Sequence, residues 1–223
     1  MLHSTYYHKE TNEDPKTSSV FENLMLLPDN VFWYILKQSC FSSNTLLSNS
    51  GKLLSVQFWP HWDSKGTDNA HFVEPDVFLR FEEFDVIIEA KYGDVGGQGE
   101  RQWQNEIIAY HNEFEHKKPF AFIAIGGNYS ATEETIKVGK ELVSIHKCNW
   151  LSILISINKY KNELEKISVP DMANSATMRL LDNIILAFNI NGVYNIEWFN
   201  TMALPTTIIN PSSLDNISTI YKW

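Results

Sequence analysis

Residues 74–91 read EPDVFLRFEEFDVIIEAK, and this stretch decides the fold. Two runs rich in Val, Ile and Phe lie on either side of Glu82-Glu83, and this spacing predicts a β-hairpin with a two-residue turn. In that register Asp76 faces Glu89 across the two strands. Because directly opposed residues have Cβ atoms about 5 Å apart, the sequence predicts two carboxylates side by side at the open end of the hairpin.

The strand face that carries Glu89 also carries Lys91, because side chains alternate along a strand. Two acids and an ammonium group are therefore expected at one spot, in strands otherwise made of core residues. Adjacent carboxylates repel, and each half-buried charge needs a partner. A divalent cation resolves this conflict, since Mg²⁺ takes one or two carboxylates, water and substrate phosphate oxygens. Lys91 would position or help deprotonate a metal-bound water, or neutralise the transition state.

A solvated strand face, with Asp76 in a turn, is the alternative interpretation of the same residues. A Glu-x-Lys sequence alone is too common to distinguish the two interpretations. Here a Pro-Asp pair precedes Glu89, with twelve residues between the two acids and in matching strand register. This combination favours the metal site.

The Pro-Asp pair that ends at Asp76, followed by Glu89-Ala90-Lys91, resembles the signature of the PD-(D/E)xK nuclease superfamily. The resemblance covers about residues 19–157 and implies a restriction-endonuclease-like αβββαβ core. Members are mostly restriction, repair, recombination and defence nucleases that cut DNA through Mg²⁺ or Mn²⁺. By this resemblance Asp76 and Glu89 would be metal ligands and Lys91 the catalytic lysine. Ala90 would add a ligand through its backbone carbonyl.

Two further site residues follow from the resemblance. Many members carry a Gln at the start of the helix after the Glu-x-Lys strand, and Gln102 is the candidate; the alternative is a solvated glutamine. Gln102, Glu106 and Tyr110 lie four residues apart and share one flank of this expected helix. Members also use a Glu from the first helix, and Glu22 is the candidate metal ligand. Its alternative role is to complete a capping box with Ser19.

The rest of the chain predicts alternating helices and strands. The expected elements in chain order are a helix from residue 19 that resumes at 31–37 after Pro28, a strand at 53–59, the hairpin strands 76–81 and 84–92, a helix at 100–115, a strand at 120–125, a helix at 132–146, a strand at 151–157 and a helix at 174–188. This order predicts an α/β fold with a central mixed sheet flanked by helices. We expect a single domain over residues 1–223, with residues 1–16 as a polar N-terminal arm and 61–74 as a long loop.

The composition allows one substantial core, because 43% of the 223 residues are hydrophobic. The formal net charge of −9 counts against strong nonspecific binding to nucleic acid. Either the basic surface is local, or a partner protein or a second copy of the chain supplies part of it. Cys40 and Cys148 form no CxxC pair, which argues against a structural zinc or an iron–sulfur cluster and predicts free thiols. No apolar run approaches the ~20 residues needed to cross a bilayer, and no signal peptide is recognisable, so we expect a cytoplasmic protein without membrane contact.

Other candidate groups have simpler interpretations. His61 and His71 flank the loop before Asp76 and are expected to be surface residues. The Gly-rich stretch 93–99 lacks the GK[ST] of a P-loop and predicts a flexible loop near the scissile strand. Four tryptophans are expected in the core rather than as base-stacking platforms: Trp33, Trp59, Trp103 and Trp150.

These observations predict a Mg²⁺- or Mn²⁺-dependent deoxyribonuclease that hydrolyses phosphodiester bonds, with DNA as the first expected substrate and RNA as the second. A role in restriction, phage defence or mobile-element biology is an expectation at the level of the superfamily. The main alternative is a catalytically silent nuclease-fold subunit that binds nucleic acid or a partner protein. A third interpretation is a structural interaction protein in which the motif is accidental.

Overall fold

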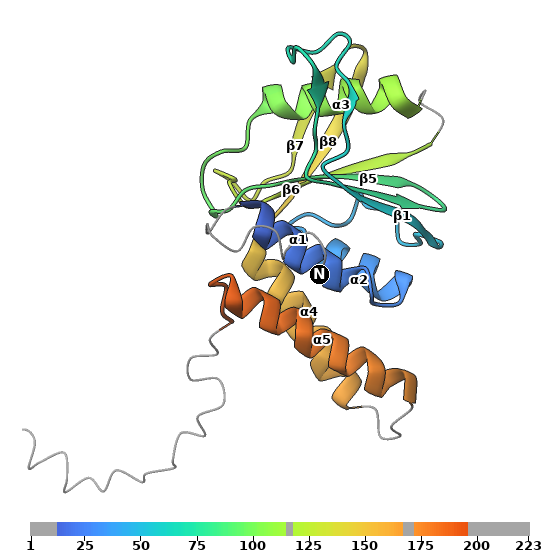
Figure 1. Ribbon diagram of the computed structural model, residues 1–223, viewed down its shortest axis with the longest axis vertical. Coiled ribbons are helices and arrows are strands. Elements are labelled where there is room, and N and C mark those ends of the chain that lie inside the picture. Colours follow the sequence, from blue (N-terminus) through green and yellow to red (C-terminus); the bar gives the residue numbers. More distant parts are fainter. Residues whose placement is uncertain (1–12, 115–117, 167–171, 196–223) are drawn as a thin grey trace, which may run out of the picture.

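The computed structural model describes residues 13–114, 118–166 and 172–195. A six-stranded mixed sheet forms its centre, and helices flank both faces (Figure 1). The helices are α1 (Glu13–Leu24), α2 (Asp29–Ser39), α3 (Glu100–Phe114), α4 (Trp150–Glu165) and α5 (Met172–Ile190). The strands are β1 (Leu53–Phe58), β2 (Trp62–Asp63), β3 (Phe72–Val73), β4 (Val77–Phe81), β5 (Asp85–Ala90), β6 (Phe120–Ile125), β7 (Glu134–Val138) and β8 (Glu141–Cys148).

The sheet has the strand order β1-β4-β5-β6-β8-β7. Strands β1, β4 and β5 are antiparallel, β5, β6 and β8 are parallel, and β7 closes the far edge as the antiparallel partner of β8. The short hairpin β2–β3 stands apart from this sheet. The predicted α/β fold with a mixed sheet flanked by helices is therefore confirmed.

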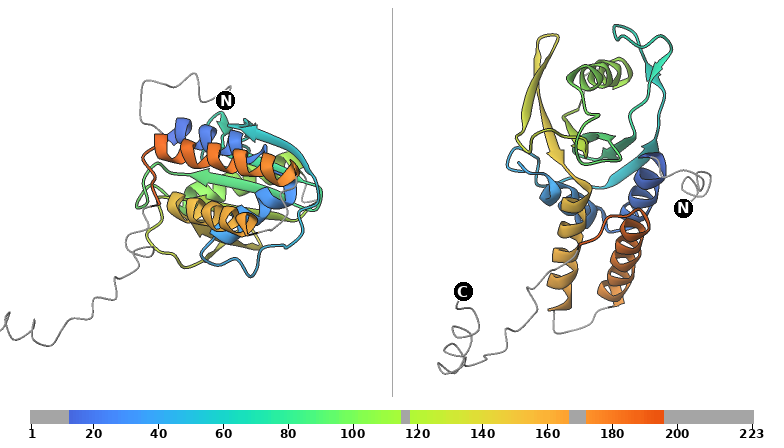
Figure 2. Two further views of the ribbon diagram at one scale, coloured as in Figure 1. Left: turned by 90° about the horizontal axis from the view of Figure 1, so that it is seen from below. Right: turned by 90° about the vertical axis from the view of Figure 1, so that its left-hand side faces the viewer.

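Two apolar layers cover the sheet. One face packs against α1, α2, α4 and α5, and it buries alternate residues of the central strands such as Val86 and Ile88. The other face buries Phe78 and Ile87 against α3 and the β2–β3 hairpin. Figure 2 shows α3 lying between the β2–β3 and β7–β8 hairpins, with the remaining helices across the sheet. Strand β5 is buried on both faces, as its nearly continuous apolar sequence requires.

The hairpin that carries the predicted site has the expected register. Arg80 pairs with Asp85, and the Phe81 N–H donates to the carbonyl of Phe84 at 3.0 Å, which closes the two-residue turn. Glu82 is an unusual turn residue, and its N–H donates to the carbonyl of Lys52 at 2.7 Å. A loop that follows α2 thus stabilises a turn that lacks the usual Gly or Asn.

The predicted helix at 132–146 is wrong, because this segment forms the hairpin β7–β8. Its buried residues alternate, with Ile136 and Val138 on one strand and Val143 and Ile145 on the other. Gly139 makes the turn with a φ of 58°. β-Branched residues on both sides of a glycine favour a hairpin over a helix.

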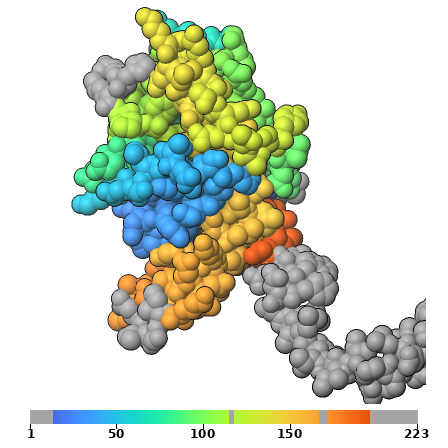
Figure 3. All heavy atoms as spheres, turned by 180° about the vertical axis from the view of Figure 1, so that it is seen from behind, coloured from blue at the N-terminus to red at the C-terminus, as the bar shows by residue number. Residues whose placement is uncertain are grey.

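The predicted strand at 151–157 is also wrong, because this segment begins α4. Asn149 caps the helix: its side chain accepts a hydrogen bond from the Ser152 N–H at 2.7 Å, and the Ser152 hydroxyl completes a capping box. The buried residues Trp150, Ile153 and Ile157 recur at helical spacing. Figure 3 shows the face on which α2 and the loop after it lie against β8 and α4.

The boundaries near the N-terminus differ from the prediction. Helix α1 starts at Glu13, so only residues 1–12 of the expected arm lie outside the described residues. Ser19 lies inside this helix, where its hydroxyl donates to the Lys16 carbonyl at 3.1 Å, and it therefore does not form an N-terminal capping box with Glu22. The expected loop at 61–74 contains the β2–β3 hairpin. Within the described residues, no helix is long and apolar enough to cross a membrane.

Candidate active site

Four predicted site residues lie together. Asp76, Glu89, Lys91 and Gln102 line one pocket of about 370 Å³, at the end of the β4–β5 hairpin. Three further residues complete the described lining: Asp14, Trp59 and Glu74. The sequence thus correctly predicted that the two strands and α3 bring these side chains to one place.

Asp76 directly precedes β4, and its side chain is only 7% exposed. The Asp76 Oδ2 atom accepts a hydrogen bond from the Ala90 N–H at 2.7 Å. The N–H and C=O of one strand residue point to the same side, so the Ala90 carbonyl also lies on the side of Asp76. The next N–H, that of Lys91, points the other way and donates to the Ile125 carbonyl at 2.7 Å. The Asp76 carboxylate is therefore held against the backbone at the end of β5, whereas Ala90 itself is not among the described residues that line the pocket.

Glu89 is the most enclosed acid of the pocket, with an exposed fraction of 2%. Its Oε1 atom accepts hydrogen bonds from the Lys91 ammonium group and from the Gln102 amide, the latter at 2.6 Å. The Gln98 amide donates to the Glu89 backbone carbonyl at 3.0 Å. Hydrogen bonds to a charged acceptor are stronger than neutral ones, so this carboxylate is held in one orientation.

Lys91 is held along its stem by two glycines. A Cβ atom on Gly97 would lie 3.1 Å from Lys91 Cδ, and one on Gly127 would lie 2.8 Å from Lys91 Cβ. The Lys91 backbone carbonyl accepts a hydrogen bond from the Trp150 indole at 2.8 Å. Lys16 of α1 donates to the next carbonyl, that of Tyr92, at 2.8 Å. The Gly-rich loop 93–99, which was expected to be flexible, and the turn after β6 thus enclose the Lys91 side chain closely.

Helix α3 contacts β5 through the flank that the sequence identified. Gln102 binds Glu89, and the Tyr110 hydroxyl donates to Asp85 Oδ2 at 3.1 Å. Glu106 lies between them and is buried, with an exposed fraction of 2%. Burial, and then the nearby carboxylate of Glu89, raise the pKa of Glu106 well above its ordinary value. The Glu106 carboxyl group is therefore harder to ionise than that of an exposed glutamate.

Glu22 has a different position from the other predicted ligands. It is buried in α1 with an exposed fraction of 3%, but Asp14 is the described α1 residue that lines the pocket. The two are eight residues apart, or about 12 Å along the helix axis. The role of Glu22 as a metal ligand stays a prediction.

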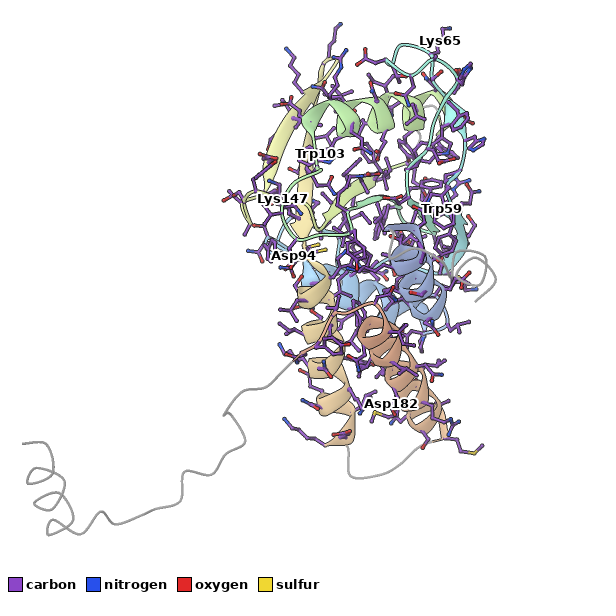
Figure 4. The ribbon with its side chains drawn as sticks, turned by 60° about the vertical axis from the view of Figure 1, so that its left-hand side comes forward. Trp59, Lys65, Asp94, Trp103, Lys147 and Asp182 are labelled. Carbon is purple, nitrogen blue, oxygen red and sulfur yellow. The ribbon has the colours of Figure 1, made fainter. Side chains whose placement is uncertain are left out.

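Several residues of the site were missed or misassigned from the sequence. Trp59 was expected in the core, yet it is half-buried, lines the pocket and has a φ of 49°. Figure 4 shows it where the sheet approaches α1. Trp33, Trp103 and Trp150 are buried as expected. Glu74 lies at the rim, where it forms an ion pair of 2.7 Å with the exposed ring of His61. Only its position directly before the Pro-Asp pair signalled its presence in the site.

Comparisons with known proteins place the chain in a family without adding a function. No protein-family model matches the sequence, and no solved structure matches it. The chain is 32% identical over 200 residues to uncharacterized protein PM0110 of Pasteurella multocida, and the alignment covers 85% of this chain and 74% of that protein. The chain belongs to the same family as this Pasteurella protein.

Proposed function

We propose that the protein is a metal-dependent nuclease of the PD-(D/E)xK type that hydrolyses phosphodiester bonds in DNA. The observation that carries the proposal is the meeting of Asp76, Glu89 and Lys91 at one pocket, with Gln102 bound to Glu89. Two buried acids beside a lysine, at the end of two core strands, destabilise the fold unless the charge of a cation or of the substrate compensates for them.

The order of elements supports the same assignment. Helices α1 and α2, the three sheet strands β1, β4 and β5, then α3 and β6 follow one another as αβββαβ, with the β2–β3 hairpin as an insertion. This is the order that the resemblance implies for a restriction-endonuclease-like core. We therefore propose that the elements from α1 to β6 form that core, and that β7, β8, α4 and α5 extend it.

The oxygen donors fit Mg²⁺ or Mn²⁺. Among the described residues, no group of three or more His, Cys, Asp or Glu side chains is placed to hold a metal ion, so the proposed site relies on two carboxylates and a backbone carbonyl. Asp76 and Glu89 would bind through their carboxylates and Ala90 through its carbonyl, leaving positions for water and phosphate oxygens, as is usual for Mg²⁺. When bound, the metal supplies Lewis acidity and lowers the pKa of a coordinated water.

The residues of the chain have distinct tasks in this proposal. Asp76 and Glu89 provide negative charge that repels a phosphodiester unless a cation intervenes, which makes the reaction metal-dependent. Lys91 keeps its ammonium group beside Glu89, where it can orient the attacking water or stabilise charge that develops on the phosphate. Gln102 fixes the Glu89 carboxylate with a neutral donor and so leaves its negative charge intact.

The net charge of −9 argues for a partner protein, and so for a second candidate, in which the fold serves as a catalytically silent subunit that binds nucleic acid or a partner protein. Under both candidates the basic surface for nucleic acid is either local or supplied in part by a partner protein or a second copy of the chain. The two candidates differ in how they depend on Lys91, because only hydrolysis requires its ammonium group.

The test uses purified protein with linear DNA, circular DNA and RNA, each with and without Mg²⁺ or Mn²⁺. We expect metal-dependent cleavage by the wild type and its loss in Lys91→Ala. The control is Lys159→Ala, which removes an exposed lysine from α4. Circular dichroism checks that both variants are folded. Nucleic-acid binding without cleavage, unchanged in Lys91→Ala, would favour the silent subunit instead.

A further inference from the structure

Three successive backbone carbonyl groups accept hydrogen bonds directly after β5, where the chain leaves the sheet. The donors are distant in the sequence and lie on α4, on α1 and in the turn after β6. They are the Trp150 indole at 2.8 Å from the Lys91 carbonyl, the Lys16 ammonium group at 2.8 Å from that of Tyr92, and the Gly127 N–H at 2.7 Å from that of Gly93. Each bond replaces one to water and restricts the backbone next to Lys91.

Lys16 is an unusual residue for its position, because its exposed fraction is only 4%. A buried ammonium group destabilises the fold unless polar partners compensate for its lost hydration. Besides the Tyr92 carbonyl, two aromatic rings provide this compensation: the nitrogen lies 4.2 Å from the centre of the Tyr92 ring and 5.3 Å from that of Trp150. An apolar side chain of the same length would fill the space without any such requirement, so packing alone does not account for a lysine.

The segment that Lys16 anchors also forms part of the enclosure of the Lys91 side chain. The chain continues to Gly97, where a Cβ atom would lie only 3.1 Å from Lys91 Cδ. A shift of the Tyr92 carbonyl would therefore move the backbone of Lys91 and the loop around its stem together. Lys16 itself does not line the pocket among the described residues, so its effect on the reaction would pass through Lys91.

We propose that Lys16 is a positioning residue, which anchors the Tyr92 carbonyl and so holds the Lys91 ammonium group where the reaction needs it. The inference rests on the proposed function, because it takes Lys91 as the catalytic lysine. Two other roles would behave differently. Direct contact with a substrate phosphate would affect substrate binding, and a purely stabilising role would leave the rate of the folded enzyme unchanged.

The test uses Lys16→Met, which keeps the length of the side chain and removes the donor. The matched control is Lys118→Met at the opposite end of β5. It removes a half-buried ammonium group that donates to Asp85 Oδ1 at 3.0 Å and to the Phe81 carbonyl. For each protein we measure kcat and KM for DNA cleavage at saturating Mg²⁺, and backbone hydrogen exchange over residues 91–99. Urea unfolding identifies conditions in which every variant is folded.

We expect Lys16→Met to have an unchanged KM and a kcat about tenfold lower, because a misplacement of about 1 Å can cost a hundredfold in rate. Exchange over residues 91–99 should be about fivefold faster, the effect of losing one typical hydrogen bond. Lys118→Met should keep the wild-type kcat and the wild-type exchange of this segment. Trp150→Phe removes the donor to the Lys91 carbonyl and should change both quantities in the same direction as Lys16→Met.

Three results would overturn the inference. The first is a wild-type kcat and wild-type exchange in Lys16→Met. The second is a raised KM with an unchanged kcat, which indicates direct binding of the substrate. The third is an equal loss of kcat in Lys16→Met and Lys118→Met, which indicates general destabilisation. If the wild type cuts no nucleic acid while Lys16→Met still exchanges faster, the proposed function fails and the anchoring of the segment survives.

Discussion

The glycine at position 127 gives a quantitative test of how Lys91 is held. Its φ is 63°, and a Cβ atom there would lie 2.8 Å from Lys91 Cβ and 2.7 Å from the Gly96 carbonyl oxygen. Gly139 provides the matched control, because its φ is 58° and a Cβ atom would meet nothing within 4 Å. Both alanine substitutions impose a left-handed backbone, but only Gly127→Ala also forces atoms together.

The left-handed conformation costs about 1–2 kcal/mol in each variant. The lower backbone freedom of alanine in the unfolded chain offsets about 0.4–1 kcal/mol of this. Gly139→Ala should therefore lower the free energy of unfolding by about 1 kcal/mol. Crowding in a close-packed region adds about 1–3 kcal/mol, so Gly127→Ala should lose about 2–4 kcal/mol.

Gly127→Ala should also displace Lys91. Ordinary contacts begin at 3.4 Å, so the 2.8 Å approach requires a shift of roughly 0.6 Å, and a misplacement of about 1 Å can cost a hundredfold in rate. We expect about tenfold slower cleavage for Gly127→Ala and an unchanged rate for Gly139→Ala. Urea unfolding and metal-dependent DNA cleavage measure the two effects. Equal stability and equal activity of the two variants would refute the close fit around the lysine.

Three further predictions concern separate parts of the molecule. Tyr110→Phe removes a hydrogen bond to the buried Asp85 and should lower the free energy of unfolding by about 1–3 kcal/mol in urea; no loss would contradict the contact. Burial lowers the pKa of His146 below 6.5, so the contribution of the neutral ring to stability is present above that pH and is lost as the pH falls. The urea midpoint should therefore drop more on acidification in the wild type than in His146→Gln, and identical drops would contradict this. Asp76→Asn keeps an acceptor for the Ala90 N–H but removes the charge, so the fold should persist while Mn²⁺ affinity, measured by calorimetry, falls at least about tenfold; unchanged affinity would exclude Asp76 as a ligand.

The β4–β5 hairpin at the centre of the fold could be predicted because residues close together in the sequence determine it. The side-chain period of two and the short turn fix which residues oppose one another, and the pairing of Arg80 with Asp85 follows the predicted register. The stabilisation of the turn could not be predicted. The N–H groups of Glu82 and Glu83 donate to the carbonyls of Lys52 and Ser50, which lie about thirty residues earlier in the chain.

The two errors in secondary structure came from short apolar runs, whose periodicity fits a helix or a strand about equally well. Turn and helix-capping residues carried the missing information. Gly139 interrupts the supposed helix at the point where the β7–β8 hairpin turns. Asn149 and Ser152 form a capping box at the start of the supposed strand, which predicts a helix start.

The site was only partly accessible from the sequence. Asp76, Glu89 and Lys91 lie in one hairpin, and Gln102 follows soon after, so local geometry brings them together. The remaining components come from distant segments. Asp14 of α1 lines the pocket, and the turn after β6 confines Lys91. Both contacts depend on how the whole sheet packs.

Single-turnover cleavage of plasmid DNA by Glu89→Gln tests the central claim most directly. Glutamine keeps the size of Glu89 and an acceptor for Gln102, but it removes the negative charge that the proposed metal requires. With Mg²⁺, the wild type should cut the plasmid and Glu89→Gln should be slower by at least about a hundredfold, while both remain folded. Cleavage by the folded Glu89→Gln protein at the wild-type rate would contradict a metal-dependent site at this pocket.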